Sequence, residues 1–229
     1  VTFSPGNLQY HPANDEWRFA ENQADYIGDA NSNISDTYNG WLDLFGWSTA
    51  STYFGVSTSE NNDDYYGSFV DWGTNQIGTE APNTWRTLTK GEWYYLFNVR
   101  TNASSLYGVA HVCGIGGMVV LPDNWITPTD ISFKSGLSES SYKNHQTFTY
   151  EQWLQMEKAG AVFLPANGYR EGTNVDVVRI DGYYWSSTGV NSTGVNDGAA
   201  YDVYFSDSYV MESIDLCKRG QSVRLVKDL

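Results

Sequence analysis

The sequence predicts an α+β domain that combines two helices with short strands and long ordered loops. Three observations lead to this fold class: aromatic residues make up 16% of the 229 residues while Lys and Glu are scarce, two segments carry a helix-capping pattern, and strand-like runs separated by Gly, Asn and Ser fill the last third. Aromatic residues favour strands, and few Lys and Glu argue against a helical bundle. We find no internal repeat or Pro-rich linker, so residues 1–229 are predicted to form a single domain.

Both predicted helices begin at a capping box, in which a threonine and the residue three positions later satisfy each other's backbone N–H groups. Thr89 and Glu92 predict one helix over residues 90–99. Thr149 and Gln152 predict a second helix in YEQWLQMEKAG, and Gly160 is expected to end it.

The remaining regular structure is predicted to be strands. VTFSPGNLQYHP and EWRFA indicate two short strands around an Asn-Asp turn. YGVAHVCGIGGMVVLPDNW indicates a hairpin that turns at residues 114–117. Four further strands are predicted in AVFLPANGYR, GYYWSST, AAYDVYFSD and QSVRLVKD.

Residues 21–84 show no helical period and are predicted to be long loops pinned by aromatic side chains. The expected loop anchors are Trp41, Phe45, Trp47, Phe69 and Trp72. A loop region of this length inside a domain indicates either a function or a scaffold that fixes its loops with aromatic residues.

The charge balance narrows the range of partners. With 27 acidic and 13 basic residues the formal net charge is −14, which repels a nucleic-acid backbone and disfavours an anionic membrane surface. The sequence contains no apolar run of about 18 residues, so we expect no membrane insertion of this domain. No charged-then-apolar leader opens the sequence and Val1 enters a strand-like segment, which indicates a mature or trimmed chain.

The two cysteines fit no metal-ligand spacing. Cys113 and Cys217 are far apart in the sequence and outside any Cys-x-x-Cys pattern. They form either one disulfide or two unpaired thiols, and the sequence leaves both alternatives open.

Five motifs in a fixed order resemble a family of surface proteins from gut Bacteroidetes and Fibrobacter. They are WRTLTKGEWYYLFNVR, AVFLPANGYR, GYYWSST, AYDVYFS and QSVRLVKD. That family is similar to the C-type-lectin-like superfamily, which includes the formylglycine-generating enzymes, also called sulfatase-modifying factors. The resemblance implies a fold of two helices and a twisted antiparallel sheet with long loops. It also implies a secreted protein, extracellular or on the outer cell surface, carried on a lipoprotein or an adhesin.

The same superfamily includes the variable proteins of diversity-generating retroelements, whose ligand contacts lie between strands that resemble GYYWSST and SVRLV. The resemblance therefore implies that residues 189–219 form the ligand-binding region. This region is rich in Tyr, Ser, Asn and Asp, which binding surfaces use for rigid contacts and adaptable hydrogen bonds. The predicted contact residues are Asn191, Asn196, Asp202, Tyr204, Ser206, Ser208, Tyr209 and Glu212. One sequence leaves open whether these positions are hypervariable.

Strand alternation assigns sides to the residues of this region. Val203 and Phe205 are apolar and share one face, which we expect to meet the core. The row left to face outward consists of Asp202, Tyr204 and Ser206. These three are the leading candidates for direct ligand contact.

Two further positions are expected to be structural. Alternation places Tyr183 and Trp185 on one face of their strand and Tyr184 on the other, and we expect the Trp185 side to be core. Arg224 is expected to pair with an interior carboxylate or with carbonyl groups rather than with a ligand.

The cysteines, histidine and glycines that could serve an enzyme do not form a recognisable catalytic pattern. The oxidase branch of the similar superfamily uses a pair of neighbouring cysteines near its C-terminus, whereas only Cys217 lies in that region here. His111 and Cys113 share a strand face, which formally allows a nucleophile pair, but two core or edge residues explain that spacing better. A strand, not a helix, follows the glycines at 114–117, so they lack the requirement for phosphate binding. We therefore predict no catalytic residue.

Carboxylates in the acidic loops raise the alternative of a metal site. The candidate sets are Asp63 and Asp64 with Glu60, and Asp202 with Asp207. Neither set follows a calcium-loop pattern such as D-x-D-x-D-G, and the Glu-Pro-Asn and Trp-Asn-Asp sets of calcium-dependent lectins do not occur in the sequence. We predict no cofactor and no metal ligand, with calcium binding by the acidic loops as the alternative.

The predicted function is non-catalytic: an extracellular or cell-surface domain that binds a glycan or a protein on another surface through its C-terminal Tyr/Asp/Ser-rich region. One alternative is a structural or tip component of an adhesin-like or pilus-like surface fibre. Another is an enzyme related to the formylglycine-generating oxidase, or a glycan hydrolase. An exposed sheet edge would favour the fibre component, and a pocket with converging titratable groups would favour the enzyme. The sequence identifies neither the ligand nor the oligomeric state.

Overall fold

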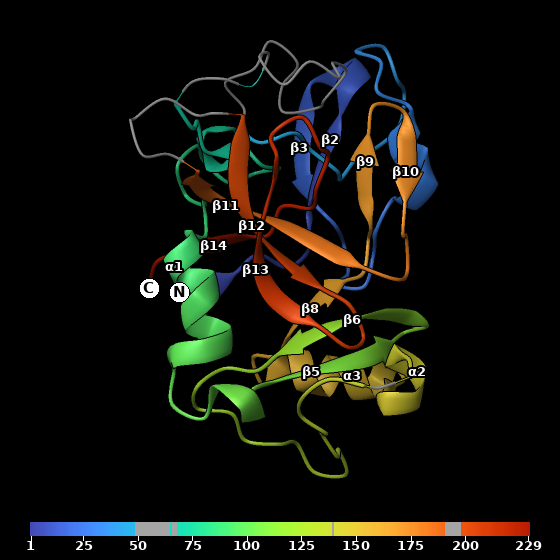
Figure 1. Cartoon of the computed structure of the whole chain (residues 1–229), viewed down its shortest axis with the longest axis vertical. Coiled ribbons are helices and arrows are strands. Elements are labelled where there is room, and N and C mark those ends of the chain that lie inside the picture. The colour runs from blue at the N-terminus through green and yellow to red at the C-terminus, as the bar shows by residue number, and fades with distance from the viewer. Residues whose placement is uncertain (49–64, 66–67, 139, 191–197) are drawn as a thin grey trace.

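The computed structural model describes residues 1–48, 65, 68–138, 140–190 and 198–229 (Figure 1). It is a mixed α+β structure built mainly from small sheets with few helices, which confirms the predicted fold class at this level. The chain is longer in one direction than in the others, with a lower half that carries the α-helices and an upper half of hairpins and loops (Figure 1).

The lower half contains a four-stranded sheet of order β7-β5-β6-β8. Its strands are β5 (Tyr107–Val112), β6 (Ile115–Val120), β7 (Thr147–Phe148) and β8 (Val162–Pro165). The predicted hairpin is the β5–β6 pair, but it turns at Cys113 and Gly114, both at positive φ. Gly117 lies inside β6 instead, where an added Cβ would sit 2.3 Å from the carbonyl oxygen of Leu164 in β8. Its lack of a side chain therefore allows β6 and β8 to pair.

The second predicted helix is α3 (Tyr150–Lys158), which begins at the predicted capping box. Thr149 accepts a hydrogen bond from the backbone N–H of Gln152, whose side chain accepts one from the N–H of Thr149 (3.0 Å). Gly160 follows the helix at φ +97°, a conformation that favours glycine. A four-residue helix that the sequence pattern did not predict, α2 (Tyr142–His145), precedes β7.

The first predicted helix also begins at its capping box. Thr89 accepts from the backbone N–H of Glu92, and the Glu92 carboxylate accepts from the N–H of Thr89 (2.8 Å). The helix is α1 (Lys90–Tyr94), and it continues as the π-helical segment η5 (Tyr95–Val99). Together they cover the residues that the sequence predicted to be helical.

The upper half contains hairpins and short helical turns. The hairpins are β2 (Leu8–His11) with β3 (Glu16–Phe19), as predicted, and β9 (Tyr169–Glu171) with β10 (Asn174–Asp176). The 3₁₀ turns are η1 (Pro12–Asn14), η2 (Gly28–Ser32), η4 (Trp72–Thr74) and, lower in the molecule, η6 (Ala103–Ser105). A separate three-stranded ladder joins the two ends of the chain: β1 (Thr2–Phe3), β14 (Leu225–Lys227) and β4 (Arg86–Thr87).

A second antiparallel sheet, the C-terminal sheet, has the order β11-β12-β13. Its strands are β11 (Gly182–Gly189), β12 (Ala199–Phe205) and β13 (Val210–Leu216). It runs between the upper hairpins and the lower sheet (Figure 1). The sequence predicted β11 and β12. It did not predict β13, because VMESIDL lacks the apolar-polar alternation of a half-buried strand.

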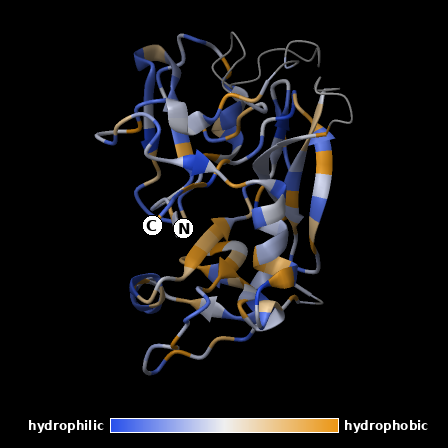
Figure 2. Cartoon of the chain, turned by 90° about the vertical axis from the view of Figure 1, so that its left-hand side faces the viewer, coloured by the Kyte–Doolittle hydropathy of each residue, from blue (hydrophilic) through white to orange (hydrophobic). Residues whose placement is uncertain are grey.

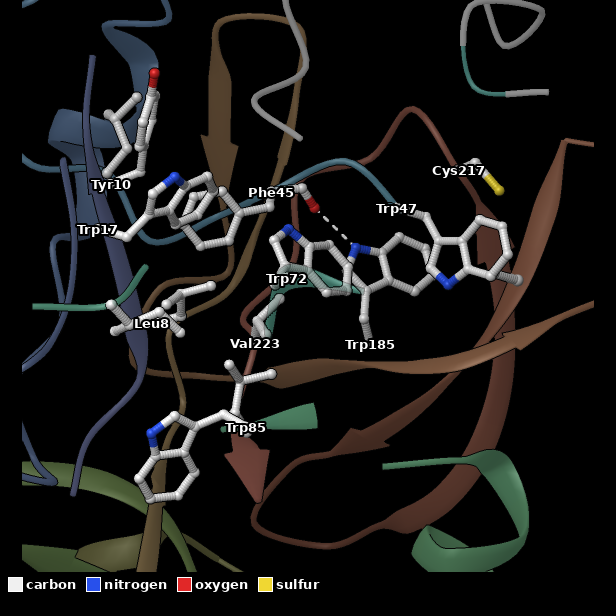
Figure 3. Packing of buried hydrophobic residues seen from close by; sticks show 14 of the residues in the cluster. Leu8, Tyr10, Trp17, Phe45, Trp47, Trp72, Trp85, Trp185, Cys217 and Val223 are labelled. Carbon is white, nitrogen blue, oxygen red and sulfur yellow. Dashed lines mark hydrogen bonds between the residues drawn. The ribbon is translucent and has the colours of Figure 1, made fainter. Parts of the chain in front are cut away.

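Aromatic side chains form most of the upper core (Figure 3). Trp185 is fully buried there, and its indole N–H donates a 2.7 Å hydrogen bond to the backbone oxygen of Phe45. The predicted core position of Trp185 is therefore confirmed. Tyr184, on the opposite face of β11, is also fully buried, so the strand is covered on both sides at this point.

The predicted loop anchors are largely confirmed. Phe45, Trp47 and Trp72 are buried, and Phe69 packs partly buried against Trp47 at a ring distance of 4.8 Å. Trp41 is less buried than expected, and the guanidinium of Arg18 lies 3.8 Å from its ring centre. These contacts replace regular secondary structure as the means of holding the loops.

The lower core is more aliphatic than the upper one, and Figure 2 shows hydrophobic strands gathered in the lower half. Val119, Met156 and Phe163 belong to this cluster and are almost entirely removed from water. Among the described residues, no helix has the length and apolar character needed to cross a membrane.

The two cysteines are not bonded to each other. Cys217 is buried in the upper core, whereas Cys113 is exposed in the β5–β6 turn of the lower sheet. Of the two alternatives left open by the sequence, the structure therefore has the one without a disulfide.

Candidate ligand-binding surface

Three partly exposed tyrosines, which we call the tyrosine row, lie side by side across the C-terminal sheet and the β9–β10 hairpin. They are Tyr169 in β9, Tyr183 in β11 and Tyr204 in β12. The Tyr169 and Tyr183 ring centres are 5.3 Å apart, and those of Tyr183 and Tyr204 are 5.0 Å apart. Ring contacts on both sides of Tyr183 fix its orientation, so the row is a preformed aromatic strip.

Glycines before two of these tyrosines bring their strands together. Gly168 and Gly182 form a parallel bridge, which places Tyr169 and Tyr183 next to each other. Gly168 has φ +69°, and an added Cβ would lie 2.1 Å from the carbonyl oxygen of Asp176. A Cβ at Gly182 would lie 2.1 Å from the Phe205 ring. Both positions therefore exclude larger residues for steric reasons.

Charged groups flank one end of the row. The guanidinium of Arg219 lies 4.9 Å from the Tyr169 ring centre. Arg219 also forms salt bridges with Asp215 (2.9 Å) and Glu171 (3.5 Å), and Lys218 contacts Glu171 at 3.2 Å. This network holds Arg219 against the tyrosine ring.

Two carboxylates lie near the other end of the row. Burial raises the pKa of Asp181, and the negative charge of Asp207 raises it further, while the hydroxyl groups of Tyr183 and Tyr204 act to lower it. Burial and the nearby Asp181 raise the pKa of Tyr183, so its hydroxyl stays protonated. The row therefore presents neutral hydroxyl groups next to acceptor oxygens.

The expected outward row is corrected at Asp202. Val203 and Phe205 face the core as predicted, but the side chain of Asp202 is also buried, with only 2% of its surface exposed. The chain after β13 covers this face: Gln221 reaches β13, where its amide donates to Asp215 (3.0 Å). Alternation placed Asp202 on the correct side of β12, but it could not show that the second side is covered.

The buried carboxyl of Asp202 has an unusual environment. Among the described residues neither of its oxygens has a hydrogen bond of normal geometry. The nearby Gln221 amide donates to Asp215 (3.0 Å) and acts only to lower the Asp202 pKa. Burial, followed by the negative charge of Asp215, raises the pKa of Asp202 to about 7. Asp202 also does not pair with Asp207, whose charge acts on Asp181 at the opposite end of the row. Asp202 is therefore an interior residue and not a contact residue.

The predicted serines build the turn between β12 and β13. The Ser206 hydroxyl accepts from the backbone N–H groups of Ser208 and Tyr209, both at 3.2 Å, and Ser206 is buried. This correction follows from turn chemistry, in which a serine hydroxyl replaces a backbone acceptor. Ser208 and Tyr209 are exposed, and Glu212 is partly buried in β13.

The remaining predicted positions differ in their outcome. Tyr204 is partly exposed and belongs to the tyrosine row. Asn191 and Asn196 lie outside the described residues, as do Glu60, Asp63 and Asp64 of the alternative calcium set. Within the described ranges, no group of three or more His, Cys, Asp or Glu side chains is placed to hold a metal ion.

Sequence reasoning missed Tyr169, Tyr183, Asp181 and Arg219. Tyr183 was assigned to the same strand face as Trp185, and that face was expected to be buried. Trp185 is buried, but Tyr183 is partly exposed, so the covered part of this face does not extend to Tyr183. A signal was present in the sequence: the dipeptide Gly-Tyr occurs at both 168–169 and 182–183. Glycine followed by an aromatic residue at two neighbouring strand starts indicates close strand approach with aromatic display.

Arg224 pairs with interior carbonyl groups, as expected. It is fully buried, and its guanidinium donates to the side-chain carbonyl oxygens of Gln23 (2.6 Å) and Asn7 (3.4 Å). Burial lowers its pKa to about 10. Its role is to join the N-terminal segment to the terminal strand.

The thiol and imidazole weighed for nucleophilic chemistry are poorly suited to it. Cys113 lies in the turn at φ +51°, outside β5, so it does not share a strand face with His111. Burial and the charges of Asp25, Glu151 and Glu157 raise the pKa of the Cys113 thiol, which disfavours the reactive thiolate. This environment agrees with the preferred structural interpretation of the pair.

A cavity of about 720 Å³ lies far from the tyrosine row in the fold, between β1, the α1–η5 helix, the end of β6 and the end of α3. Its polar lining groups already have partners. Arg100 donates to the carbonyl oxygens of Leu96, Leu121 and Leu106, and Gln23 donates to Glu157 (2.7 Å). Because specific pockets need free polar groups that orient a ligand, we prefer the tyrosine row as the candidate site.

Comparison of this chain with models of protein families, with curated proteins and with solved structures finds no match. The candidate site therefore rests on its own geometry.

Proposed function

We propose that this protein is a non-catalytic recognition domain that binds a glycan, or a protein loop, through the tyrosine row. The observation that carries the proposal is the preformed strip of three half-exposed tyrosine rings with Arg219 at one end and Asp181 at the other. Binding surfaces favour tyrosine because it buries a large area at low entropic cost and keeps a polar hydroxyl group.

The chemistry of the strip suits a carbohydrate well. The C–H faces of sugar rings pack against aromatic rings, and sugar hydroxyl groups pair with phenol, carboxylate and guanidinium groups. The Tyr183 and Tyr204 rings lie 5.0 Å apart and are tilted by 38°, so a sugar unit can pack against this pair. The Tyr169 ring meets Tyr183 edge-on at 5.3 Å and 75°, and with Arg219 it offers further contacts at the end of the row. Because mutual contacts already fix the rings, a ligand loses little affinity to ordering them.

Fold family and location are parts of the same proposal. The five motifs that resemble C-type-lectin-like surface proteins support a C-type-lectin-like fold. The capping box within the first motif begins α1, and the capping box upstream of the second motif begins α3. With that family comes an extracellular location, on a lipoprotein or adhesin at the outer cell surface. Calcium dependence stays a separate alternative and is included in the test below.

The test is binding of the purified chain to arrays of glycans and host proteins. We expect the double variant Tyr183→Ser, Tyr204→Ser to lose binding by about tenfold or more, because buried aromatic anchors dominate the affinity of such surfaces. The matched control is Tyr94→Ser, Tyr150→Ser, which removes two exposed tyrosines outside the row and outside the predicted contact residues. Equal binding by the parent and the row variant would show that the site is elsewhere. Loss of binding when a chelator is added would show that binding depends on calcium.

One observation favours the glycan-hydrolase alternative as a second candidate. Burial and Asp207 raise the pKa of Asp181, and a carboxyl with a raised pKa close to a second carboxylate is what a glycosidase requires. The same array experiment separates the two functions. Release of sugar from bound glycans that Asp181→Asn abolishes would make the protein an enzyme, whereas stable binding without release supports the recognition domain.

A further inference from the structure

The outer edge of β13 is open for hydrogen bonding. β13 ends the sheet order β11-β12-β13, so among the residues that the structure describes only one of its two sides is paired. The Ser206 N–H donates to the Tyr209 carbonyl (2.9 Å) at one end of the β12–β13 ladder, and the Cys217 N–H donates to the Gly198 carbonyl (2.9 Å) at the other. These two pairs determine which residues of β13 bond to β12.

Counting from either end, bonded and non-bonded pairs alternate along the ladder. Val210, Glu212 and Ile214 occupy the non-bonded pairs, so their N–H and C=O groups point away from β12. In the part of the chain that the structure describes, no hydrogen bond reaches these outward groups. The edge therefore presents a row of free donors and acceptors.

Large apolar side chains are exposed along the same strand. Met211 and Ile214 are each 53% exposed, and Leu216 is 41% exposed. α1 contacts β11, β12 and β13, so it lies across the sheet and not along this edge. Natural edge strands are usually protected by lysine, proline or a bulge, but VMESIDL contains no lysine or proline and pairs with β12 without a register shift.

From this edge we infer that β13 binds an extended, basic segment of a partner protein, which adds a fourth strand to the C-terminal sheet. Backbone pairing with Val210, Glu212 and Ile214 supplies the affinity, and apolar side chains of the added strand pack beside Ile214 and Leu216. The charge favours a basic partner, because Glu212 lies on the strand and the chain has a net charge of −14. The same charge disfavours a second copy of this chain.

This interaction is independent of ligand binding at the tyrosine row. Met211 lies opposite Tyr204 in the register, so the added strand extends the sheet beside the row without covering its tyrosine rings. One face of the sheet can then hold a ligand while its edge is attached to a partner, the arrangement that a component of a surface assembly needs.

The experiment measures fluorescence anisotropy of a labelled peptide, about eight residues long, with the whole chain. One strand face of this peptide, which we call the Val-Lys peptide, carries Lys to meet Glu212 and Val to meet Ile214 and Leu216, because these three residues share a face of β13; its other face carries Thr. We expect it to bind, and the variant Ile214→Lys, Leu216→Lys to weaken binding by about tenfold or more. Ile126→Lys is the matched control, because Ile126 is 81% exposed outside the C-terminal sheet. Far-UV circular dichroism and the thermal midpoint check that all variants are folded.

Two further peptides test the mode of binding. The same peptide with Glu in place of Lys should bind more weakly, and a Val-Lys peptide with N-methylated amides should not bind, because it cannot pair with the edge. Equal binding of the methylated peptide, equal binding by the edge variant, or no binding of the Val-Lys peptide to the folded parent would overturn the inference. A dimer that the edge variant abolishes would assign the edge to a second copy instead. Loss of tyrosine-row function leaves these outcomes unchanged.

Discussion

The two faces of the C-terminal sheet use similar residues for different purposes. On one face Tyr184, Val203 and Phe205 are fully or almost fully buried, and the Tyr184 and Phe205 rings stack at 6.0 Å and 18°. On the other face Tyr183 and Tyr204 are half-buried, and their rings contact each other at the surface. Tyrosine therefore serves as core on one side and as a candidate binding surface on the other, and only the covering elements distinguish the two.

The second face itself is divided. At the end near the upper core, Trp185 and Asp202 are covered by Gln221 and the chain that follows β13. A buried carboxyl without a hydrogen bond lowers the free energy of unfolding. The contrast between faces, and between the two ends of one face, leads to three predictions.

The largest effect is expected from the apolar face. Phe205→Ala should lower the free energy of unfolding by about 3 to 5 kcal/mol, because it leaves a cavity under Gly182 and Tyr184. Chemical denaturation monitored by tryptophan fluorescence measures this value. Tyr204→Ala, one residue away on the half-exposed face, is the control and should cost about 1 kcal/mol or less. Similar losses for both variants would contradict the assigned difference between the faces.

The next effect concerns Asp202 and depends on pH. The folded protein keeps the Asp202 proton up to about pH 7, whereas an unfolded chain releases it near about pH 4. Between these values the folded state binds more protons, so this group's contribution to stability decreases as the pH rises. Asp202→Asn should remove that decrease, which amounts to on the order of 3 kcal/mol.

The measurement compares the free energy of unfolding of parent and Asp202→Asn from about pH 4 to about pH 8. The difference between them should change in favour of the variant as the pH rises. Asp36→Asn, at an exposed position outside the C-terminal sheet, is the matched control. A parent and an Asp202→Asn variant with parallel pH profiles would show that Asp202 is not held neutral by burial.

The smallest effect is expected within the tyrosine row. Tyr183→Phe removes one hydroxyl that lowers the pKa of Asp181, so the Asp181 pKa should rise. The free energy of unfolding should change by about 0.5 kcal/mol or less, because the ring contacts with Tyr169 and Tyr204 remain. NMR titration of the Asp181 carboxyl carbon measures the pKa, with Tyr209→Phe as the control. An unchanged pKa would show that Asp181 does not interact with the Tyr183 hydroxyl.

Elements with local signals were predictable from the sequence. Both capping boxes identified their helices because the reciprocal hydrogen bonds involve residues only three positions apart. The β5–β6 hairpin and β12 were recognised from short apolar runs and turn residues. β13 was missed because its apolar side chains Met211, Ile214 and Leu216 are exposed, so no half-buried pattern marks it.

The candidate site was only partly predictable. Tyr204 was identified by alternation along one strand, which is a local property. Tyr169 was not, because its proximity to Tyr183 depends on the Gly168–Gly182 bridge between separate strands. Two of the outward-row residues were wrongly predicted to be exposed. Asp202 is buried under the chain around Gln221, and the Ser206 side chain is taken up by a hydrogen bond within its own turn.

The sequence by itself determined the α+β class, the starts of both capped helices, the aromatic loop anchors and the side of β12 to which each residue belongs. Each of these depends on neighbouring residues and on the period of a helix or strand. The tertiary structure alone decided which sides of the strands are covered and that the two cysteines are not bonded to each other. It also decided that Asp202 is buried while Tyr183 stays partly exposed. Coverage depends on where the chain returns after a turn, and that is set by packing among residues far apart in the sequence.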